Sequence, residues 1–383
     1  MRNTFKILPV LTGDVSGAAS ALFELGGMTV IHDPSGCNST YNTHDETRWY
    51  SNDSLIYITG LNDVDAITGN DDKFINSTIE AARELEPKFI SLTNSPIPFL
   101  NGTDFEGICK IISGRTGITT FHVDTNATGD YISGASKALE AYVKAFADSK
   151  PVRSSDQIRV AVIGATPLDL ANPESVKSVA SFLADYGFEP VYCLGMDAGL
   201  DIEPQDKLTE VDVNLVISSA GIKAAMYMEE KFNIPYVAGF PSEGMKDTLA
   251  GALNETYKSG VSGFAYSNVV RSVSDKYIVG EPVIASSIAA GFKRKYDIDI
   301  NVIAVTDEGL VPVSEVDAYS STEDTITEAL KDAKTVIADP LYKYVSPADA
   351  KFIRLPHLAM SGRLYLKEVP DLCKFDPIKE GLL

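Results

Sequence analysis

The chain has 383 residues, more than one ordinary domain holds, so we expect two or three domains. Its net charge is −20, from 33 basic and 53 acidic residues, which argues against nucleic acid and anionic membranes as partners. No apolar run reaches the ~18 residues that cross a membrane. The short apolar N-terminus is interrupted by Gly13 and Asp14, so we expect a cytoplasmic chain without a signal peptide.

Strand and helix patterns alternate along the first block, which is typical of α/β layers with mostly parallel sheets. A turn is expected at residues 96–98, where two prolines flank an isoleucine. The predicted strands are 6–11, 28–33, 55–60, 88–94 and 117–124, and the predicted helices are 14–25, 71–85, one starting at Asp104 and one through 138–146.

Two further units repeat this pattern after a polar stretch, residues 147–157, that is predicted to be a linker. Their predicted strands lie at 158–163, 188–195, 214–221, 234–240, 276–280 and 300–305, with helices at 173–186, 223–232 and 282–296. The chain closes with two further apolar segments, 335–342 and 352–360. We therefore expect an α/β fold of three Rossmann-like domains, 1–150, 151–270 and 271–383. In such sheets ligands bind at the carboxyl ends of the strands.

Glycine-containing turns follow the first strand of the second and third units. They read Gly164-Ala165-Thr166 and Gly280-Glu281-Pro282. Neither turn has the spacing of a dinucleotide-binding or Walker motif, so we expect no nucleotide to bind this chain.

Four cysteines lie too far apart for a CxxC or zinc pattern. Cys109 and Cys193 fall within a predicted helix and a predicted strand and are expected in the core, and Cys373 has no visible partner. Cys37 instead lies in a Pro-Ser-Gly turn just after a strand. It could be a nucleophile beside His44, a metal ligand shared across a two-fold axis, or a small buried residue.

Polar side chains gather just after three strands of the first block. His44 and Arg48 follow the first of them and form a pair of basic groups that could bind an anionic substrate or supply protons. A salt bridge of this pair with Asp45 or Glu46 is the alternative.

The segment VIHDPSGCNSTYNTHDETRW, residues 30–49, resembles the cluster-binding turn of the nitrogenase component 1 family. That family comprises molybdenum–iron protein subunits, cofactor-assembly scaffolds and dark protochlorophyllide reductase subunits. Residues 58–110, 214–236 and 279–292 resemble further family segments in the same order. The resemblance covers most of the chain and implies three Rossmann-like domains around a central crevice.

The resemblance also implies a ligand set, from which this sequence departs. Cys37, preceded by Gly36, matches the first cluster cysteine of the family. The second would fall near 58–60, where there is no cysteine, and the third near Asn94, where Ser95 takes its place. The cysteine that anchors the iron–molybdenum cofactor would fall at about Ser218, so no such cofactor and no dinitrogen reduction are expected.

What the resemblance implies for function is a component 1-like subunit in a homodimer, or in a heterodimer with a paralogous chain. An ATP-dependent iron-protein-like reductase would supply electrons through an interfacial iron–sulfur cluster, expected to be 4Fe-4S and oxygen-sensitive. The substrate would be a small molecule such as a tetrapyrrole or a sulfur compound, with His357 facing it in the crevice.

Two alternatives remain at this stage. The missing cysteines favour a non-catalytic scaffold or carrier for a metal cluster or tetrapyrrole. A periplasmic-type solute binder is the weaker reading, because no signal peptide is expected.

Overall fold

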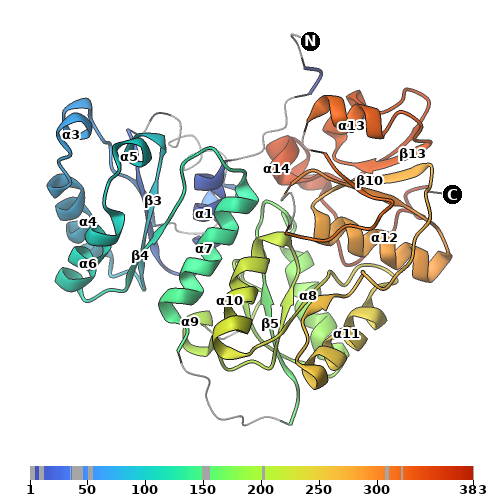
Figure 1. The fold of residues 1–383 in the computed structure, drawn as a ribbon, viewed down its shortest axis with the longest axis horizontal. Coiled ribbons are helices and arrows are strands. Elements are labelled where there is room, and N and C mark those ends of the chain that lie inside the picture. Colours follow the sequence, from blue (N-terminus) through green and yellow to red (C-terminus); the bar gives the residue numbers. More distant parts are fainter. Residues whose placement is uncertain are drawn as a thin grey trace.

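The computed structural model describes residues 5–7, 13–34, 36, 46–50, 55–148, 156–200, 203–306, 310–320 and 322–382. Within these ranges the strands form three sheets, all of whose named strand pairs are parallel. Figure 1 shows the first sheet on the left, the second at the lower right and the third at the upper right. The fold confirms the predicted α/β class with Rossmann-like domains. The boundaries at 150 and 270 stay a prediction.

The first sheet has the strand order β2-β1-β3-β4. Its two central strands are buried along their whole length, as expected of parallel strands covered on both faces. The strands are β1 Met28–His32, β2 Ile56–Ile58, β3 Ile90–Asn94 and β4 Thr120–Val123, and the helices are α1 Asp14–Leu22, η2 Thr47–Tyr50, α3 Asp63–Thr68, α4 Asp72–Leu85, α5 Pro96–Asn101, α6 Phe105–Thr116 and α7 Tyr131–Phe146.

The second sheet has the order β6-β5-β7-β8-β9. Its central strands β5 and β7 are rich in valine and isoleucine, which suit buried parallel strands. The strands are β5 Arg159–Ile163, β6 Glu189–Leu194, β7 Val213–Val216, β8 Tyr236–Ala238 and β9 Gly263–Phe264, and the helices are α8 Pro173–Asp185, α9 Pro204–Lys207, η3 Ser219–Gly221, α10 Ile222–Phe232 and α11 Lys246–Ser259.

The third sheet has the order β12-β11-β10-β13-β14. Its first helix, α12, is buried through eleven consecutive residues because it packs between this sheet and the second unit. The strands are β10 Lys276–Gly280, β11 Asn301–Ala304, β12 Ala318–Tyr319, β13 Thr335–Ala338 and β14 Lys351–Arg354, and the helices are α12 Pro282–Tyr296, α13 Glu323–Ala329, η4 Pro340–Tyr344, α14 Leu358–Ser361 and η5 Gly362–Glu368.

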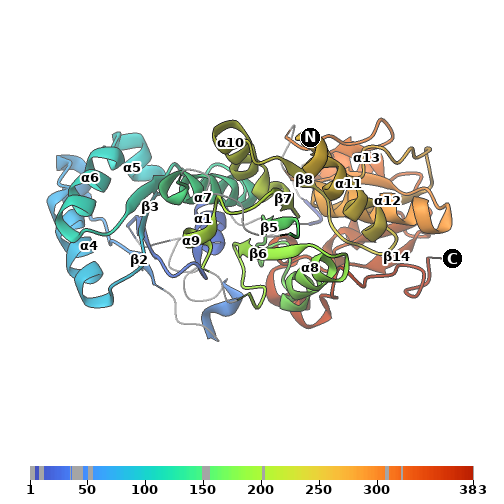
Figure 2. The same cartoon turned by 90° about the horizontal axis from the view of Figure 1, so that it is seen from below.

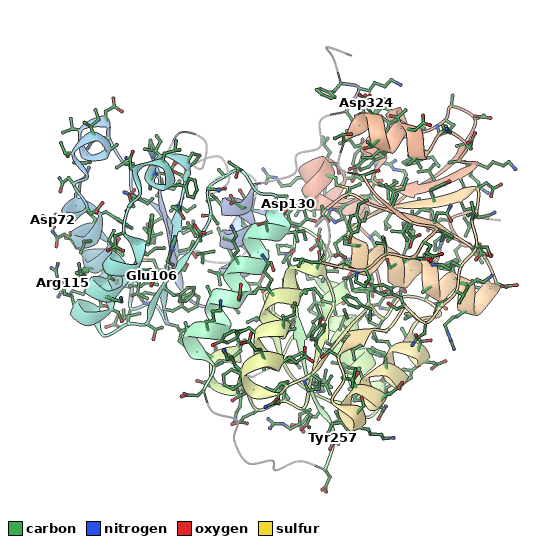
Figure 3. All side chains as sticks on the ribbon, viewed as in Figure 1. Asp72, Glu106, Arg115, Asp130, Tyr257 and Asp324 are labelled. Carbon is green, nitrogen blue, oxygen red and sulfur yellow. The ribbon has the colours of Figure 1, made fainter. Side chains whose placement is uncertain are left out.

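Helix α7 connects the first sheet to the second. It packs on α1 and β4 on one side and on α10 and η3 on the other. Figure 1 shows α7 between α1 and α10, and Figure 2 shows the three helices side by side. Its N-cap is Asp130, labelled in Figure 3, whose carboxylate accepts a hydrogen bond from the Ser133 N–H. The first residue of α7, Tyr131, contacts Asp169 of the second unit and lies near His357 of the third, so the three units approach one another here.

The crossing of α1 and α7 depends on two glycines. A Cβ atom on Gly17 would lie 2.0 Å from the carbonyl oxygen of Tyr131, and one on Gly134 would lie 1.7 Å from that of Asp14. No side chain fits at either position, so the two helix backbones pack directly on each other.

The structure corrects three sequence predictions. The strand predicted at 214–221 ends at Val216, and residues 219–221 form the 3-10 helix η3. The turn expected at residues 96–98 is the first turn of helix α5, capped by Ser95 and ended by Gly102 in the left-handed region. Both prolines fit there because the first turn of a helix has N–H groups without intrahelical partners. The strand predicted at 6–11 is absent at Lys6 and Ile7, and its other residues lie outside the described ranges.

Several elements were not predicted from the sequence. They include helices α11 and α13 and the two-residue edge strands β9 and β12. In the described part of the chain, no helix combines the length and the apolar character that crossing a membrane requires.

Candidate functional site

The carboxyl edge of the first sheet places Ser95 and Asn94 beside the start of the Cys37 turn. Strands β1 and β3 pair in register, with His32 opposite Asn94, and the Ser95 N–H donates to the His32 carbonyl over 3.4 Å. Residues that follow β1 and residues that follow β3 therefore emerge side by side. Gly36, the last described residue before Cys37, is exposed, and its Cβ position is open.

Ser95 and Asn94 differ in how their polar atoms are used. The Asn94 amide oxygen accepts from the Thr125 N–H and lies 3.0 Å from His122 Nε2, and its backbone carbonyl accepts from the Thr125 hydroxyl. The Ser95 hydroxyl is fully buried and has no hydrogen-bond partner among the residues that the structure describes. A buried polar atom without a partner is uncommon and needs an explanation. Asn94 thus holds the strand end in place, whereas the Ser95 hydroxyl has no partner within the described ranges.

Two histidines that the sequence analysis passed over lie at this same edge. His32 stacks on Phe74 with ring centroids 4.3 Å apart, and His122 stacks on Phe105 at 4.5 Å. Burial lowers the pKa of His32 to about 4 and also lowers the pKa of His122. Both imidazoles are therefore neutral at neutral pH. An aromatic neighbour contributed by a distant helix leaves no signal in the local sequence.

Three of the four thiols lie in the hydrophobic core. Cys109, Cys193 and Cys373 are buried and free, and burial raises the pKa of the Cys109 thiol to about 12 and raises the pKa of the other two as well. A thiol must lose its proton to bind a metal, so none of these three is suited to the task. Cys37 and His44 lie outside the described residues.

A four-iron cluster needs four ligands, so its fit to this edge can be tested on the residues present. In the described ranges, no group of three or more His, Cys, Asp or Glu side chains could hold a metal ion. The Ser95 hydroxyl, which has no hydrogen-bond partner among the described residues, is a candidate for one further ligand at this edge. One oxygen per chain from the described residues is fewer than a four-iron cluster requires. A two-fold axis would double whatever ligands one chain offers.

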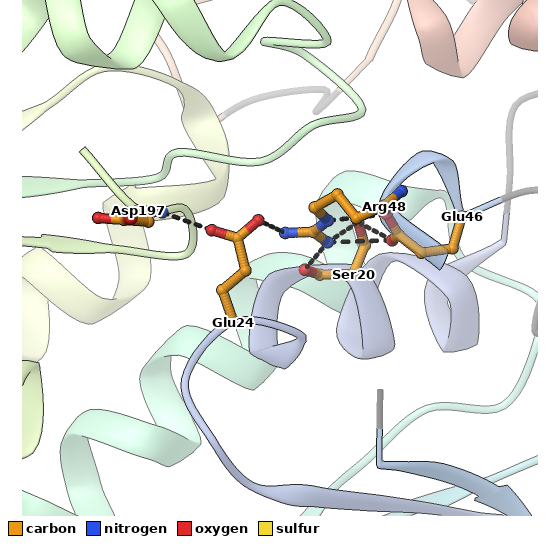
Figure 4. A network of polar contacts seen from close by, with 5 residues as sticks. All are labelled: Ser20, Glu24, Glu46, Arg48 and Asp197. Carbon is orange, nitrogen blue, oxygen red and sulfur yellow. Dashed lines mark hydrogen bonds and ion pairs between the residues drawn. The ribbon is translucent and has the colours of Figure 1, made fainter. Parts of the chain in front are cut away.

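Arg48 lies in a buried polar network rather than at an open crevice (Figure 4). Its guanidinium donates to Glu46 over 2.7 Å, to Glu24 over 2.7 Å and to the Ser20 carbonyl over 2.8 Å. Burial alone would lower the pKa of Arg48, but the two carboxylates outweigh it and raise the pKa. The salt bridge with Glu46, the alternative considered from the sequence, is therefore present. Its role toward a substrate stays a prediction.

The same network joins the first and second units. The second oxygen of the Glu24 carboxylate, which does not contact Arg48, accepts from the Asp197 N–H over 2.5 Å. Asp197 follows β6 of the second sheet. Glu24 therefore links Arg48, just after the Cys37 turn, to the second sheet.

His357 lies in a second polar site, between the second and third sheets. It follows β14, and its Nε2 atom is 3.2 Å from a carboxylate oxygen of Asp169, which follows β5. That oxygen also accepts from the Tyr131 hydroxyl of α7 over 2.6 Å. The three units thus each contribute one side chain to this contact. His357 and Ser95 belong to different edges, so the structure does not bring all the predicted site residues together.

Glu281 is the last member of this crevice site. The sequence analysis named it only as part of a glycine-containing turn and did not predict a functional role for it. It caps α12, and its carboxylate accepts from the Ile284 N–H and, across the sheets, from the Ser219 N–H, each over 2.8 Å. Burial, and then the charge of Asp169, raise the pKa of Glu281 to about 7.

The raised pKa of Glu281 predicts how stability depends on pH. The folded chain holds a proton on Glu281 that the unfolded chain releases from pH 4.5 upward, so this group destabilises the fold as pH rises toward 7. The loss reaches roughly 3 kcal/mol above pH 7. The measurement is the free energy of urea unfolding at a series of pH values. We expect it to fall more steeply with rising pH in the wild type than in Glu281→Gln. His32, whose pKa is lowered, changes stability in the opposite direction in both proteins and so cancels.

The comparison must use the pH slope rather than the absolute stability. The glutamine amide nitrogen cannot accept an N–H, so the variant carries a constant penalty at every pH. If the free energy of unfolding changed equally with pH in both proteins, the raised pKa of Glu281 would be contradicted.

Comparison with known proteins shows the family of this chain. The sequence profile of the nitrogenase component 1 type oxidoreductases matches residues 14–250. The chain belongs to this family. Over 218 residues it is 27% identical to the nitrogenase iron-molybdenum cofactor biosynthesis protein NifE of Clostridium pasteurianum. That match covers 54% of this chain and 45% of NifE, so it spans less than half of the curated relative.

Two solved structures of nitrogenase Cp1 share the fold. A structure of nitrogenase Cp1 at pH 6.5 superimposes with a TM-score of 0.61 at 12% identity, covering 93% of this chain and 85% of that one. A second, at pH 5, gives a TM-score of 0.59 at 14% identity with the same coverage. The family resemblance expected from the sequence is thereby confirmed.

Proposed function

We propose that this component 1 type chain is an oxidoreductase subunit that reduces a small molecule in the crevice between its sheets. The observation that carries the proposal is the buried Ser95 hydroxyl, which has no hydrogen-bond partner among the described residues and lies where the chain leaves β3, next to the residues that follow β1. The three thiols that the structure describes, by contrast, are buried in the core. Cys37 and Ser95 from each of two chains would hold an interfacial iron–sulfur cluster. When bound, that cluster would supply electrons one at a time at low potential.

Residues of this chain would act at both the proposed cluster and the proposed substrate site. His32 and His122, neutral and stacked on aromatic rings, keep charge away from the cluster edge. Arg48 holds the end of the turn through Glu46 and Glu24, so we assign it a positioning role. His44 and His357 are proposed to meet the substrate or its protons, His357 at the crevice site with Asp169.

The partners follow from the same proposal. The second chain is another copy or a paralogue, and the electron donor is an ATP-dependent iron-protein-like reductase. The substrate class we favour is a tetrapyrrole or a sulfur-containing molecule. A low-potential iron–sulfur cluster would be oxygen-sensitive, so we expect the protein to work under anaerobic conditions.

A second candidate function is a scaffold that holds a metal cluster and passes it on. The similarity to a protein named for cofactor biosynthesis favours it. A scaffold would lose its iron to an acceptor protein, whereas an electron-transfer subunit would retain it through repeated reduction.

One experiment separates the two candidates. The anaerobically reconstituted chain is mixed with an iron-protein-like reductase, with ATP or with a non-hydrolysable analogue, and its visible absorbance is followed. For the oxidoreductase we expect bleaching that needs both reductase and ATP, with iron retained. Iron moving to an apo acceptor protein without ATP-dependent bleaching would favour the scaffold and contradict the leading proposal.

The free hydroxyl of Ser95 gives a more local prediction. Ser95→Cys would add a second thiol per chain at the proposed cluster, so we expect it to slow the loss of iron to a chelator. Ser136→Cys is the matched control, because the Ser136 hydroxyl is also buried and unpartnered among the described residues but lies within α7. Equal rates of iron loss in Ser95→Cys and Ser136→Cys would remove Ser95 from the ligand set.

A further inference from the structure

A small cavity lies between the second and third sheets, at the crevice site. Its volume is about 30 Å³, measured as the space open to the centre of a water-sized sphere, which is room for about two water molecules. Three of its lining residues can carry charge: Asp169, Glu281 and His357. The remaining lining residues are apolar apart from backbone groups, and none of them is a lysine or an arginine.

The two carboxylates of the cavity already have protein donors. Asp169 accepts from the Tyr131 and Thr166 hydroxyls, and Glu281 accepts from two backbone N–H groups. His357 differs, because neither of its ring nitrogens has a hydrogen-bond partner among the described residues, although Nε2 lies near Asp169. Water in the cavity would satisfy this imidazole and connect it to both carboxylates.

The charge of this site is unbalanced without a proton. Two carboxylates and a neutral imidazole would place two negative charges in a buried space lined by no basic side chain. One bound proton halves this charge, whether it sits on Glu281, on Asp169 or on His357. Groups this close titrate together, so the proton belongs to the set rather than to one residue.

We propose that Asp169, Glu281 and His357 share one exchangeable proton at neutral pH, carried between them by cavity water, as a proton store facing the crevice. Its use as a proton source for reduction rests on the proposed function. The existence of the shared proton does not.

The groups around this site cannot supply the missing positive charge. Tyr131 and Tyr266 both feel the charge of Glu281, and burial together with the nearby carboxylates raises the pKa of both, so they stay neutral. Arg271, which acts on Tyr266, is paired with Asp317. The Asp339 carboxylate accepts from the His357 backbone N–H and from the Ser361 hydroxyl, which adds negative charge. The charges around the site therefore favour the bound proton, against the two backbone N–H groups that stabilise the charged form of Glu281.

Infrared spectroscopy of the iron-free chain tests the proposal directly. We expect the C=O band of a buried carboxylic acid that disappears as pH rises through about 7 and shifts in heavy water, because the proton exchanges. Glu281→Gln should abolish this band, because Glu281 is the carboxyl whose pKa burial raises and on which the proton therefore mainly resides. Asp169→Asn should move its midpoint down by about one unit or more, because a like charge is removed.

Glu323→Gln is the matched control. Glu323 is also buried and also accepts two backbone N–H groups, from Lys6 and Ile7, but it lies outside the cavity. It should leave the band unchanged. Should Glu281→Gln fail to fold, the shift in Asp169→Asn carries the test. A wild type without the band, a band that persists in Glu281→Gln, or a band that does not exchange would each overturn the proposal.

The outcome is separable from that of the proposed function, because no iron is present in the sample. If the band titrates but the chain never binds iron, the shared proton is supported and the electron-transfer role is contradicted. If the chain binds iron but lacks the band, the shared proton is contradicted and the electron-transfer role still stands.

Discussion

Gly134→Ala is expected to lower the free energy of unfolding by about 3 kcal/mol, the upper end of the usual range for overpacking. The added methyl carbon would lie 1.7 Å from the Asp14 carbonyl oxygen, which is backbone at the start of α1 and cannot move aside. The helices would have to separate, and α7 is the element that connects the first two sheets. Denaturant unfolding followed by circular dichroism measures the change.

Gly114→Ala is the matched control for this substitution. Gly114 is also a helical glycine, but it is exposed and no atom lies within 4 Å of its Cβ position. Alanine there should raise stability by about 0.5–1 kcal/mol, because it restricts the unfolded chain and favours the helix. If both variants changed stability alike, the close crossing of α1 and α7 would not be what holds the two helices.

Arg48→Met is expected to cost about 3–5 kcal/mol, the range for removing one partner of a buried ion pair. Glu46 is 3% exposed and would keep its charge without the guanidinium that now donates to both of its oxygens. The cation also lies 4.4 Å from the centre of the Phe23 ring, a contact that methionine only partly replaces. Urea unfolding at neutral pH measures the loss.

Two controls show whether the buried charge causes that loss. Adding Glu46→Gln to Arg48→Met removes the unpaired carboxylate and should recover a large part of the stability. Lys177→Met removes an exposed partner of Glu174 and should have no measurable effect. A double variant no more stable than Arg48→Met would show that lost packing, not stranded charge, dominates.

The elements that the sequence predicted well are those with a strong local signal. Asp104, where the sequence predicts a helix to start, caps α6 with its carboxylate, and the apolar β-branched run at 159–163 forms β5. The helix predicted through 138–146 is α7, but its start at Tyr131 was not predicted. The error at residues 96–98 came from reading two prolines as a turn, although a helix accepts proline throughout its first turn. The two-residue strands β9 and β12 were missed because they are defined by pairing rather than by composition.

The crevice site could not be read from the sequence in the same way. Tyr131, Asp169 and Glu281 lie in three units far apart in the chain, and only the packing of α7 and α12 brings them together. Glu281 was visible only as the middle of a glycine turn. Arg48 was singled out as a basic group for substrate, but its partners Glu24 and Ser20 come from the preceding helix and loop, which no local motif announces.

The central claim is that Cys37 holds an iron–sulfur cluster shared between two chains. The most direct measurement is iron and acid-labile sulfide per chain after anaerobic reconstitution, in the wild type and in Cys37→Ala side by side. The account predicts about two irons and two sulfides per wild-type chain, half of a four-iron cluster, and their loss in Cys37→Ala. Equal iron in both proteins, or none in either, would contradict it.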